Sequence, residues 1–282
     1  MKVPYFFRLF IVIVGILFFD LGNVLCAQEI GLQLYSLRNE FKTDVPGTLA
    51  KIKEWKIKQI EGGDTYGLKV EEYKKLLLQN NLEMVSYGAD FGELENNPQA
   101  VADKAKAFGA KYIMCAWVPH KEGVFTIEEI NQAIQVFSKA GKLLSENGLT
   151  FCYHPHGYEF RPYEDGTLFD YMVKNTDPKY VNFEMDVFWV KHPGQDPVAL
   201  LKKYPARFLM LHLKDRKPGT AGNQDGHAPD ETNVVLGSGD VGIAAIMKQA
   251  KENGVKYYFI EDESPKAVEQ IPQSLLFLGS LK

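Results

Sequence analysis

Short apolar runs alternate with longer amphipathic stretches along most of the chain, which predicts strands and helices in turn. Eight apolar runs have strand character: residues 30–37, 59–62, 83–87, 112–117, 150–154, 181–188, 208–214 and 257–261. Between them apolar residues recur at helical spacing, most clearly at 126–147, where Thr126 predicts an N-cap. Nearly continuous apolar strands alternating with helices indicate a parallel sheet that is covered on both faces. Eight such units predict a single-domain α/β protein, a closed (β/α)8 TIM barrel.

The N-terminus has a different pattern. Lys2 and Arg8 accompany an apolar run at 9–19, and Ala27 supplies a small residue before a polar segment. These features are typical of a cleaved signal peptide, and the run is shorter than the ~18 residues of a membrane span. An uncleaved anchor is the alternative. We expect a signal peptide at 1–27, a barrel at 28–282, and a periplasmic or secreted protein without membrane contact after cleavage.

Charge and cysteine content narrow the class of protein. The net charge is −4 for the whole chain and about −5 once residues 1–27, with two basic residues and one acidic residue, are removed. An acidic chain without a long basic run argues against nucleic acid as a partner. Cys115 and Cys152 each lie in an apolar run, which predicts buried free thiols rather than a disulfide. Self-association into a homo-oligomer stays open.

Residues that suit a metal ion occur at the ends of four successive strands: His154, Asp186, His212 and Glu261. The C-terminal ends of barrel strands lie on one rim, so these side chains could converge on one ion. Two imidazoles and two carboxylates favour Mn, Zn, Co or Fe, and favour Mg less. Each residue alone also fits a structural role, such as a core histidine. Their shared position at four strand ends is what predicts a metal site.

Two loops on the same rim are long. One spans 155–166 and contains Glu159 and Arg161, and the other spans 216–240. Long loops without regular structure are uncommon in compact domains and often act as lids. Both follow strands, so both belong to the face that carries barrel active sites.

With these motifs the chain resembles the xylose isomerase-like TIM-barrel superfamily, which includes sugar phosphate isomerases and epimerases. The resemblance covers essentially the whole chain after residue 27. The residues that carry it are 30–36, 153–156 with Glu159 and Phe160, Asp186, 212–215, 236–239, and 260–261. It implies a divalent metal held at the strand ends. It also implies isomerisation, epimerisation or dehydration beside a carbonyl of a sugar or polyol.

One position departs from the epimerase pattern. Sugar epimerases of this family place a glutamate on the fifth strand, where this chain has His154, and this resembles the His-x-His branch with inosose dehydratase-like proteins. Glu261 remains one acid/base candidate, and His156, Glu159 and Lys214 are candidates for the second. A lysine beside a cation is expected to have a lowered pKa, and the alternative for Lys214 is a salt bridge to Asp215.

Aromatic and polar residues near the strand ends are candidates for substrate contact, because sugar sites combine aromatic faces with polar edges. They are Glu61, Trp117, His120, Trp189 and Arg161, with Gln33 and Tyr35 as weaker candidates. No Arg or Lys cluster accompanies a helix N-terminus to hold a phosphate. Free sugar phosphates are also cytoplasmic metabolites, so export favours a substrate without phosphate.

The expected function is a divalent-metal-dependent sugar isomerase or epimerase that acts through an enediolate on a non-phosphorylated keto-sugar. The alternative is a lyase or hydratase that acts on 3-keto-glucosides or their 2-hydroxyglycal products, and the histidine on the fifth strand favours it. An endonuclease of the same fold would need a basic groove. A non-catalytic carbohydrate-binding barrel is the remaining interpretation, and it would bind no metal.

Overall fold

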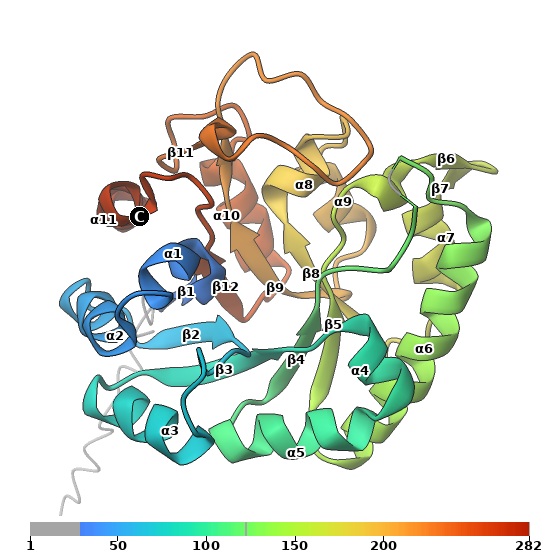
Figure 1. Cartoon of the computed structure of the whole chain (residues 1–282). Coiled ribbons are helices and arrows are strands. Elements are labelled where there is room, and N and C mark those ends of the chain that lie inside the picture. The colour runs from blue at the N-terminus through green and yellow to red at the C-terminus, as the bar shows by residue number, and fades with distance from the viewer. Residues whose placement is uncertain (1–28, 122, 282) are drawn as a thin grey trace, which may run out of the picture.

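The computed structural model describes residues 29–121 and 123–281 of the chain (Figure 1). The predicted signal peptide at 1–27 lies outside the described residues. Among the helices that are described, none is long and apolar enough to cross a membrane.

Eight parallel strands close into a barrel, which confirms the predicted fold (Figure 1). Their spatial order is β1-β12-β9-β8-β5-β4-β3-β2, and β1 pairs with β2 to close the ring. The strands are β1 Ile30–Gln33, β2 Gln59–Gly62, β3 Glu83–Gly88, β4 Tyr112–Cys115, β5 Thr150–Tyr153, β8 Asn182–Asp186, β9 Phe208–Leu213 and β12 Tyr257–Ile260.

Helices surround the strands on the outside of the barrel (Figure 1). The α-helices are α1 Arg38–Phe41, α2 Val45–Glu54, α3 Val70–Gln79, α4 Phe91–Asn96, α5 Pro98–Phe108, α6 Ile127–Glu146, α7 Leu168–Lys174, α8 Val187–Lys191, α9 Pro197–Lys203, α10 Ile243–Glu252 and α11 Ala267–Ser280. Short 3-10 helices are η1 Leu34–Leu37, η2 Tyr158–Phe160 and η3 Asp230–Thr232. Two small antiparallel pairs complete the fold: β6 Pro162–Tyr163 with β7 Gly166–Thr167, and β10 Asp215–Arg216 with β11 Asn233–Val234.

Strands β1 and β8 end earlier than the apolar pattern predicts, because a side chain at the strand end caps the following turn. The side chain of Asp186 accepts hydrogen bonds from the backbone N–H groups of Phe188 and Trp189, so α8 begins where the strand was expected to continue. Gln33 likewise accepts from the backbone N–H of Tyr35 and begins η1. Both caps place a polar side chain at the rim.

The barrel interior is filled by a small apolar cluster of buried side chains: Val85, Tyr112, Cys152, Met210 and Phe259. Side chains two positions apart on a strand face the same way. Cys152, Met210 and Phe259 are therefore followed by His154, His212 and Glu261 on the inner side of the barrel. Both Cys115 and Cys152 are buried free thiols, as predicted.

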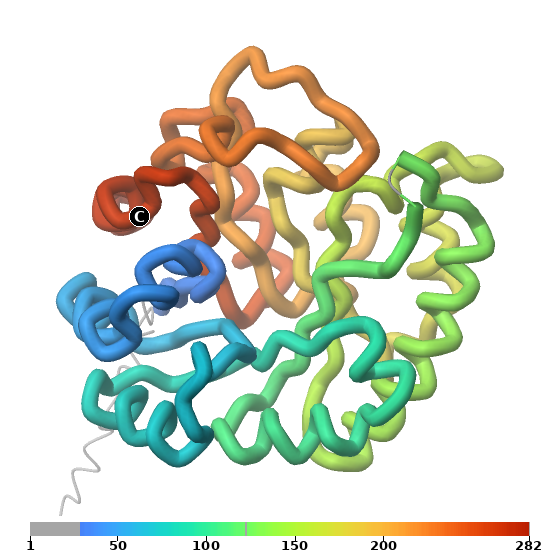
Figure 2. The backbone as a smooth tube through the Cα atoms, viewed as in Figure 1, coloured from blue at the N-terminus to red at the C-terminus, as the bar shows by residue number. Residues whose placement is uncertain are grey.

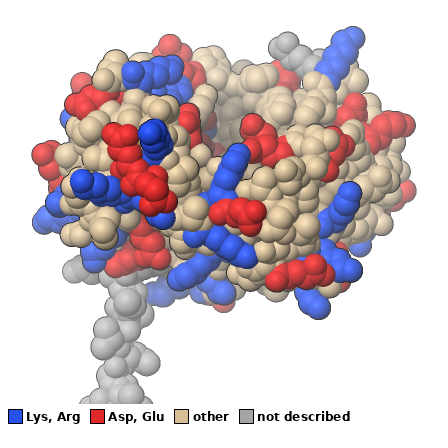
Figure 3. All heavy atoms as spheres, turned by 60° about the horizontal axis from the view of Figure 1, so that its bottom comes forward, with Lys and Arg blue, Asp and Glu red and all other residues tan. Residues whose placement is uncertain are grey.

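The long segment after β9 forms the orange arch in Figure 2, between β10 and β11. The Asp215 carboxylate fixes the stretch that follows β11 by accepting hydrogen bonds from the backbone N–H groups of Gly237, Gly239 and Val241. Gly239 has no room for a side chain, because a Cβ there would lie 2.2 Å from Asp215 Oδ1. On the face shown in Figure 3, basic and acidic side chains are interspersed, so this face offers no basic groove for nucleic acid.

Candidate metal and active site

The four predicted ligands meet at the mouth of the barrel. His154 follows β5, Asp186 ends β8, His212 lies in β9, and Glu261 follows β12. His154 Nε2 lies 3.9 Å from Asp186 Oδ2, and His212 Nδ1 lies 3.3 Å from Glu261 Oε2. One atom each of Asp186, His212 and Glu261 can be chosen so that all three lie within 4.8 Å of one another. We call these four residues the outer ligand set; that they bind a metal stays a prediction.

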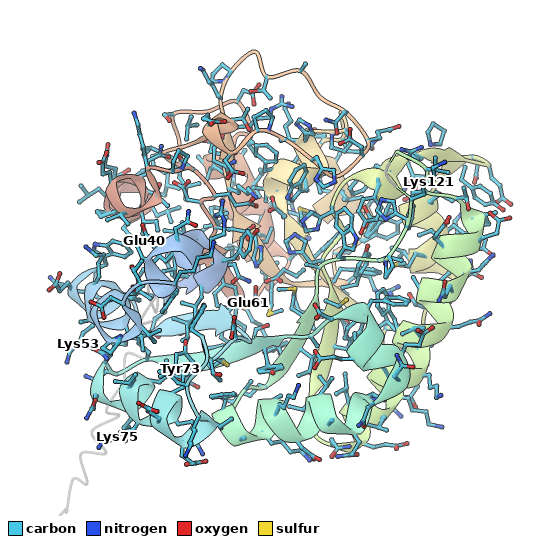
Figure 4. All side chains as sticks on the ribbon, in the orientation of Figure 1. Glu40, Lys53, Glu61, Tyr73, Lys75 and Lys121 are labelled. Carbon is cyan, nitrogen blue, oxygen red and sulfur yellow. The ribbon has the colours of Figure 1, made fainter. Side chains whose placement is uncertain are left out.

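Two further carboxylates contact the same histidines from the opposite side. Glu61 belongs to β2 and lies within the ring of strands, whereas Lys53 and Lys75 lie on the outer helices (Figure 4). Oε1 of Glu61 lies 2.6 Å from His212 Nε2. Glu184 Oε2 lies 3.3 Å from that nitrogen and 3.7 Å from Nδ1 of His154.

We call Glu61 and Glu184 the inner carboxylates. Each histidine directs one ring nitrogen toward the outer set and the other toward an inner carboxylate. Carboxylates in this second position orient metal-binding histidines and set their tautomer. Sequence reasoning missed Glu184, although its spacing of two from Asp186 on one strand places both side chains on the same face.

Buried polar atoms without partners mark the position where an ion would fit. Within the described residues no hydrogen bond reaches Nδ1 or Nε2 of His154, Nδ1 of His212, Oδ2 of Asp186, or either carboxylate oxygen of Glu184. A buried polar group left unpaired costs ~1–3 kcal/mol. Asp186 Oδ1 caps α8, which fixes the direction of Oδ2. Together these nitrogen and oxygen donors suit a divalent first-row metal.

The two histidines differ in charge because their neighbours differ. Burial lowers the pKa of His212, but the carboxylates of Glu184, Glu261 and Glu61 outweigh it and raise that pKa well above the ordinary value. Burial lowers the pKa of His154 well below the ordinary value, so this imidazole is neutral and able to coordinate a metal. The carboxylates thus gather around His212 more than around His154.

Lys214 is a fully buried cation among carboxylates. Its ammonium group donates to the Glu263 carboxylate and lies 3.4 Å from Glu261 Oε2 and 3.9 Å from Asp186 Oδ2. Burial lowers its pKa, but these three carboxylates outweigh burial and raise it. These contacts thus raise the pKa of Lys214, and its lowering by a neighbouring cation stays a prediction. The alternative pairing with Asp215 is wrong, because that carboxylate binds backbone N–H groups instead.

The charge of Lys214 has a consequence for Glu261. Burial alone would raise the pKa of Glu261, but Lys214 and then His212 hold it well below the ordinary value. Glu261 is therefore ionised at neutral pH, as a metal ligand or a base must be. Lys214 itself stays protonated and acts as a counter-charge.

A cavity of about 530 Å³ reaches three members of the outer set: His154, His212 and Glu261. This volume lies within the ~300–1,000 Å³ of small-molecule sites. Trp117 and Trp189 also line it, as predicted for substrate contact. None of the described residues that line it is Lys or Arg. The cavity therefore suits a neutral ligand with apolar faces more than a phosphate.

His156 lines the same cavity, with ring centroids 5.6 Å from Trp117 and 5.3 Å from Trp189. Burial, assisted by the charge of Lys214, lowers the pKa of His156 to about 4. The ring is therefore neutral at pH 7 and able to accept a proton from a bound molecule. Its acid/base role stays a prediction.

Glu159 does not line the cavity. Its carboxylate accepts hydrogen bonds from the Tyr153 hydroxyl and from the backbone N–H groups of His156 and Gly157. Burial raises its pKa to about 7. This position corrects the expectation of direct acid/base work: Glu159 holds the loop that carries His156.

Three residues predicted to contact substrate lie outside the cavity lining. Glu61 is fully buried against His212 and also accepts a hydrogen bond from the side chain of Gln33, at 2.7 Å. His120 stacks on Trp117, with ring centroids 4.9 Å apart. The Arg161 guanidinium donates to the backbone oxygens of Gly123 and Gln224, and so joins two loops of the rim.

The cavity is also lined by Gln33 at the end of β1 and Tyr35 in η1, the two weaker candidates for substrate contact. Asp230 in η3 and the loop residues His227 and Glu263 line it as well, and no spacing in the sequence indicated these three. The His227 ring lies 5.6 Å from that of Trp117, so the arch after β9 covers part of the cavity. Only the length of that loop signalled such a role.

Comparison with known proteins agrees with this geometry. The family described as "Xylose isomerase-like TIM barrel" matches residues 49–281. An inosose dehydratase of Clostridium botulinum is 29% identical over 181 residues, which are 57% of this chain and 60% of that protein. Inosose dehydratase 2 of Bacillus cereus is 30% identical over 174 residues, 55% of this chain and 58% of that protein. The match thus spans about 60% of the length of these relatives.

Solved structures with the same barrel cover more of the chain. A sugar phosphate isomerase/epimerase from Parabacteroides distasonis has a TM-score of 0.74 and 25% identity, and the alignment covers 90% of this chain and 94% of that one. The IOLI protein with a binding zinc atom has a TM-score of 0.71, with 90% and 98% covered. Its identity is 12%, so that likeness shows the fold alone.

Proposed function

This chain belongs to the xylose isomerase-like TIM barrel family, and from this membership and its outer ligand set we propose that it is a divalent-metal-dependent enzyme acting on a keto-sugar or keto-polyol. The observation that carries the proposal is the set of unpaired buried donors on His154, Asp186 and His212, with Glu261, at a cavity of about 530 Å³. The neighbour solved with a zinc atom supports the choice of a divalent ion.

We infer that His154, Asp186, His212 and Glu261 would hold the ion. The cavity reaches His154, His212 and Glu261, whereas Asp186 and the two inner carboxylates do not line it. A divalent ion held there would supply Lewis-acid polarisation of a carbonyl oxygen, which makes the adjacent C–H group more acidic.

Proton transfer falls to residues of the chain that reach the cavity. Neutral His156 accepts the proton from the carbon beside the carbonyl, and the C–H electron pair forms a double bond to the carbonyl carbon while the carbonyl π pair moves onto oxygen. When that pair returns, the double bond shifts to the next carbon and the hydroxyl there leaves, taking the proton from His156, so the products are water and an unsaturated ketone. Glu261, which Lys214 keeps ionised, has no proton to donate and is placed as a second proton acceptor.

We propose loss or gain of water as the reaction. The inosose dehydratase relatives support this choice, and so does the histidine at the fifth barrel strand, where epimerases carry a glutamate. An isomerase or epimerase is the second candidate, and it is supported by the name of the Parabacteroides distasonis structure. A cavity whose described lining has no Lys or Arg favours a substrate without phosphate. Export through the predicted signal peptide would favour the same choice.

Incubation with a 3-keto-glucoside and Mn²⁺ or Zn²⁺ in deuterated water tests the proposal. A product that differs from the substrate by one water, or by loss of the aglycone, supports a hydratase or lyase. Deuterium beside the carbonyl without any other mass change would identify an isomerase or epimerase. The control variant is Glu83→Gln, which changes an exposed residue at the start of β3. If the folded protein caused no metal-dependent change in any of several keto-sugars, the proposed enzyme activity would be overturned.

A further inference from the structure

A smaller cavity of about 250 Å³ adjoins the main cavity. Both are lined by Gln33, Tyr35, Gly62 and Gly63, so they share one wall. Independent ligand sites usually have ~300–1,000 Å³, so the smaller cavity is better suited to extend the first site than to serve as a separate one. A ligand that fills both is larger than one that fills the main cavity alone.

Gly62 and Gly63, which line both cavities, carry no side chain. A Cβ at Gly63 would lie 2.5 Å from the backbone oxygen of Gly88, and a Cβ at Gly62 would lie 2.9 Å from the Leu34 side chain. The backbone of Gly88 therefore leaves no room for a side chain at Gly63, whereas a side chain at Gly62 would require Leu34 to shift. At these two positions the shared wall is formed by backbone alone.

Tyr35 lines both cavities, and its side chain is 53% exposed. Trp189, which lines the main cavity, is only 5% exposed. The backbone of Tyr35 is fixed, because its N–H donates to Gln33 Oε1 and its carbonyl accepts from the Arg38 guanidinium. The Arg38 guanidinium carbon also lies 4.6 Å from the centre of the Tyr35 ring. Arg38 is in turn held by Asp230, at 2.7 Å.

A large aromatic ring that is exposed yet fixed is a ready platform for the apolar C–H face of a sugar ring, because little freedom is lost on binding. Polar groups lie beyond it in the smaller cavity, where Lys42 and Asp64 are both exposed. Charged and polar edges around an aromatic face can bind the hydroxyl groups of the same ring. The main cavity, by contrast, provides the outer ligand set.

We propose that the smaller cavity is a subsite for a second sugar ring, so that the substrate is a glycoside whose second ring stacks on Tyr35. This inference rests on the proposed function, which places the reacting ring beside the outer ligand set. A chain of contacts joins the two places: Gln33 accepts from Tyr35 and donates to Glu61, and Glu61 contacts His212.

The test measures binding of unreactive sugars to the whole protein by isothermal titration calorimetry. The probes are methyl β-glucoside and the disaccharides cellobiose, laminaribiose, maltose and trehalose. One stacked ring is expected to make at least one disaccharide bind about three- to tenfold more tightly than methyl β-glucoside. Tyr35→Ala should remove this gain, whereas Tyr35→Phe should keep it, because it retains the ring.

Equal affinity for methyl β-glucoside and every disaccharide would overturn the subsite, and so would a gain that survives in Tyr35→Ala. Thermal melting of each variant verifies folding. The proposed reaction is judged separately, from turnover of 3-keto-glucose, a single ring that does not need the subsite. If a disaccharide bound more tightly but no keto-sugar were turned over, the subsite would stand and the proposed enzyme activity would be overturned.

Discussion

Replacing Glu184 by Gln tests whether the inner carboxylates orient the histidines or hold the ion themselves. The change keeps the shape of a fully buried side chain and replaces its carboxyl group by an amide. Glu184 Oε2 contacts His212 Nε2 at 3.3 Å and His154 Nδ1 at 3.7 Å. Burial, and then the neighbouring Glu61, raise the pKa of Glu184, and a metal on the far side of the histidines would favour its ionised form. An amide cannot ionise in this way, so it holds the far nitrogens of both rings less strongly. The metal-facing nitrogens then become less basic and less well oriented.

The size of the effect follows from the number of histidines that Glu184 contacts. Loss of one orienting carboxylate typically lowers metal affinity ~10–100-fold, or about 1.4–2.7 kcal/mol. Glu184 contacts both histidines and is shielded from solvent, so we expect a loss near the upper end, about hundredfold. Asp186→Asn removes a proposed ligand directly, and the loss of affinity should be larger.

Chelator competition with Zn²⁺ or Mn²⁺ gives the dissociation constants of wild type, Glu184→Gln and Asp186→Asn. Glu83→Gln serves as the matched control at an exposed site and should bind as wild type does. Thermal melting of the metal-free proteins shows that each variant is folded. If Glu184→Gln abolished binding while Asp186→Asn kept it, the ion would belong to the inner position. Unchanged affinity in Glu184→Gln would refute the orienting role.

Other changes test single parts of the site. His156→Gln should lower kcat for keto-sugar turnover about hundredfold or more, because it removes the proposed base, and an unchanged kcat would exclude that role. Lys214→Met should lower the melting temperature of the metal-free protein, because it leaves buried carboxylates without their counter-charge at a cost of about 3–5 kcal/mol. An added divalent ion should restore part of this stability. Full stability of the variant without metal would contradict the prediction. Glu159 has a pKa raised from 4.5 to about 7, so its contribution to stability is complete below pH 4.5 and is lost as the pH rises through 7. In urea unfolding, the stability of wild type relative to Glu159→Gln should therefore fall by about 2–3 kcal/mol from pH 5 to pH 8, and Glu164→Gln, at an exposed position, should show no such trend.

The fold could be predicted because its signal is repeated eight times. Each barrel strand is a short apolar run, and the helix that follows has its own period, so small errors at element ends did not change the topology. Those errors occurred where one side chain caps a turn, as Asp186 and Gln33 do, and apolar patterning does not report such caps. Strand β8 thus ended sooner than its apolar residues indicated.

The outer ligand set was predictable for a related reason, since barrel topology brings strand ends together whatever the loops do. Glu184 was missed because the sequence does not show which residue an acidic side chain inside an apolar strand will contact. Glu159 and Arg161 were misplaced because both belong to a loop whose path depends on tertiary contacts with Tyr153 and Gln224. Their residue types gave no indication of that path.

The direction of the Lys214 shift also required three-dimensional contacts, and it bears on what the site can bind. Glu61, Glu184, Asp186 and Glu261 are all buried, while Lys214 is the one buried lysine among the described residues. A buried charge is costly unless another charge or a metal compensates it. Burial raises the pKa of Glu184 well above its ordinary value and that of Asp186 to about 7, so these carboxyl groups are not all ionised together in the metal-free protein. A divalent cation would favour their ionised forms, whereas an anionic substrate would oppose them. The geometry that points to a metal therefore also argues against a phosphate beside it.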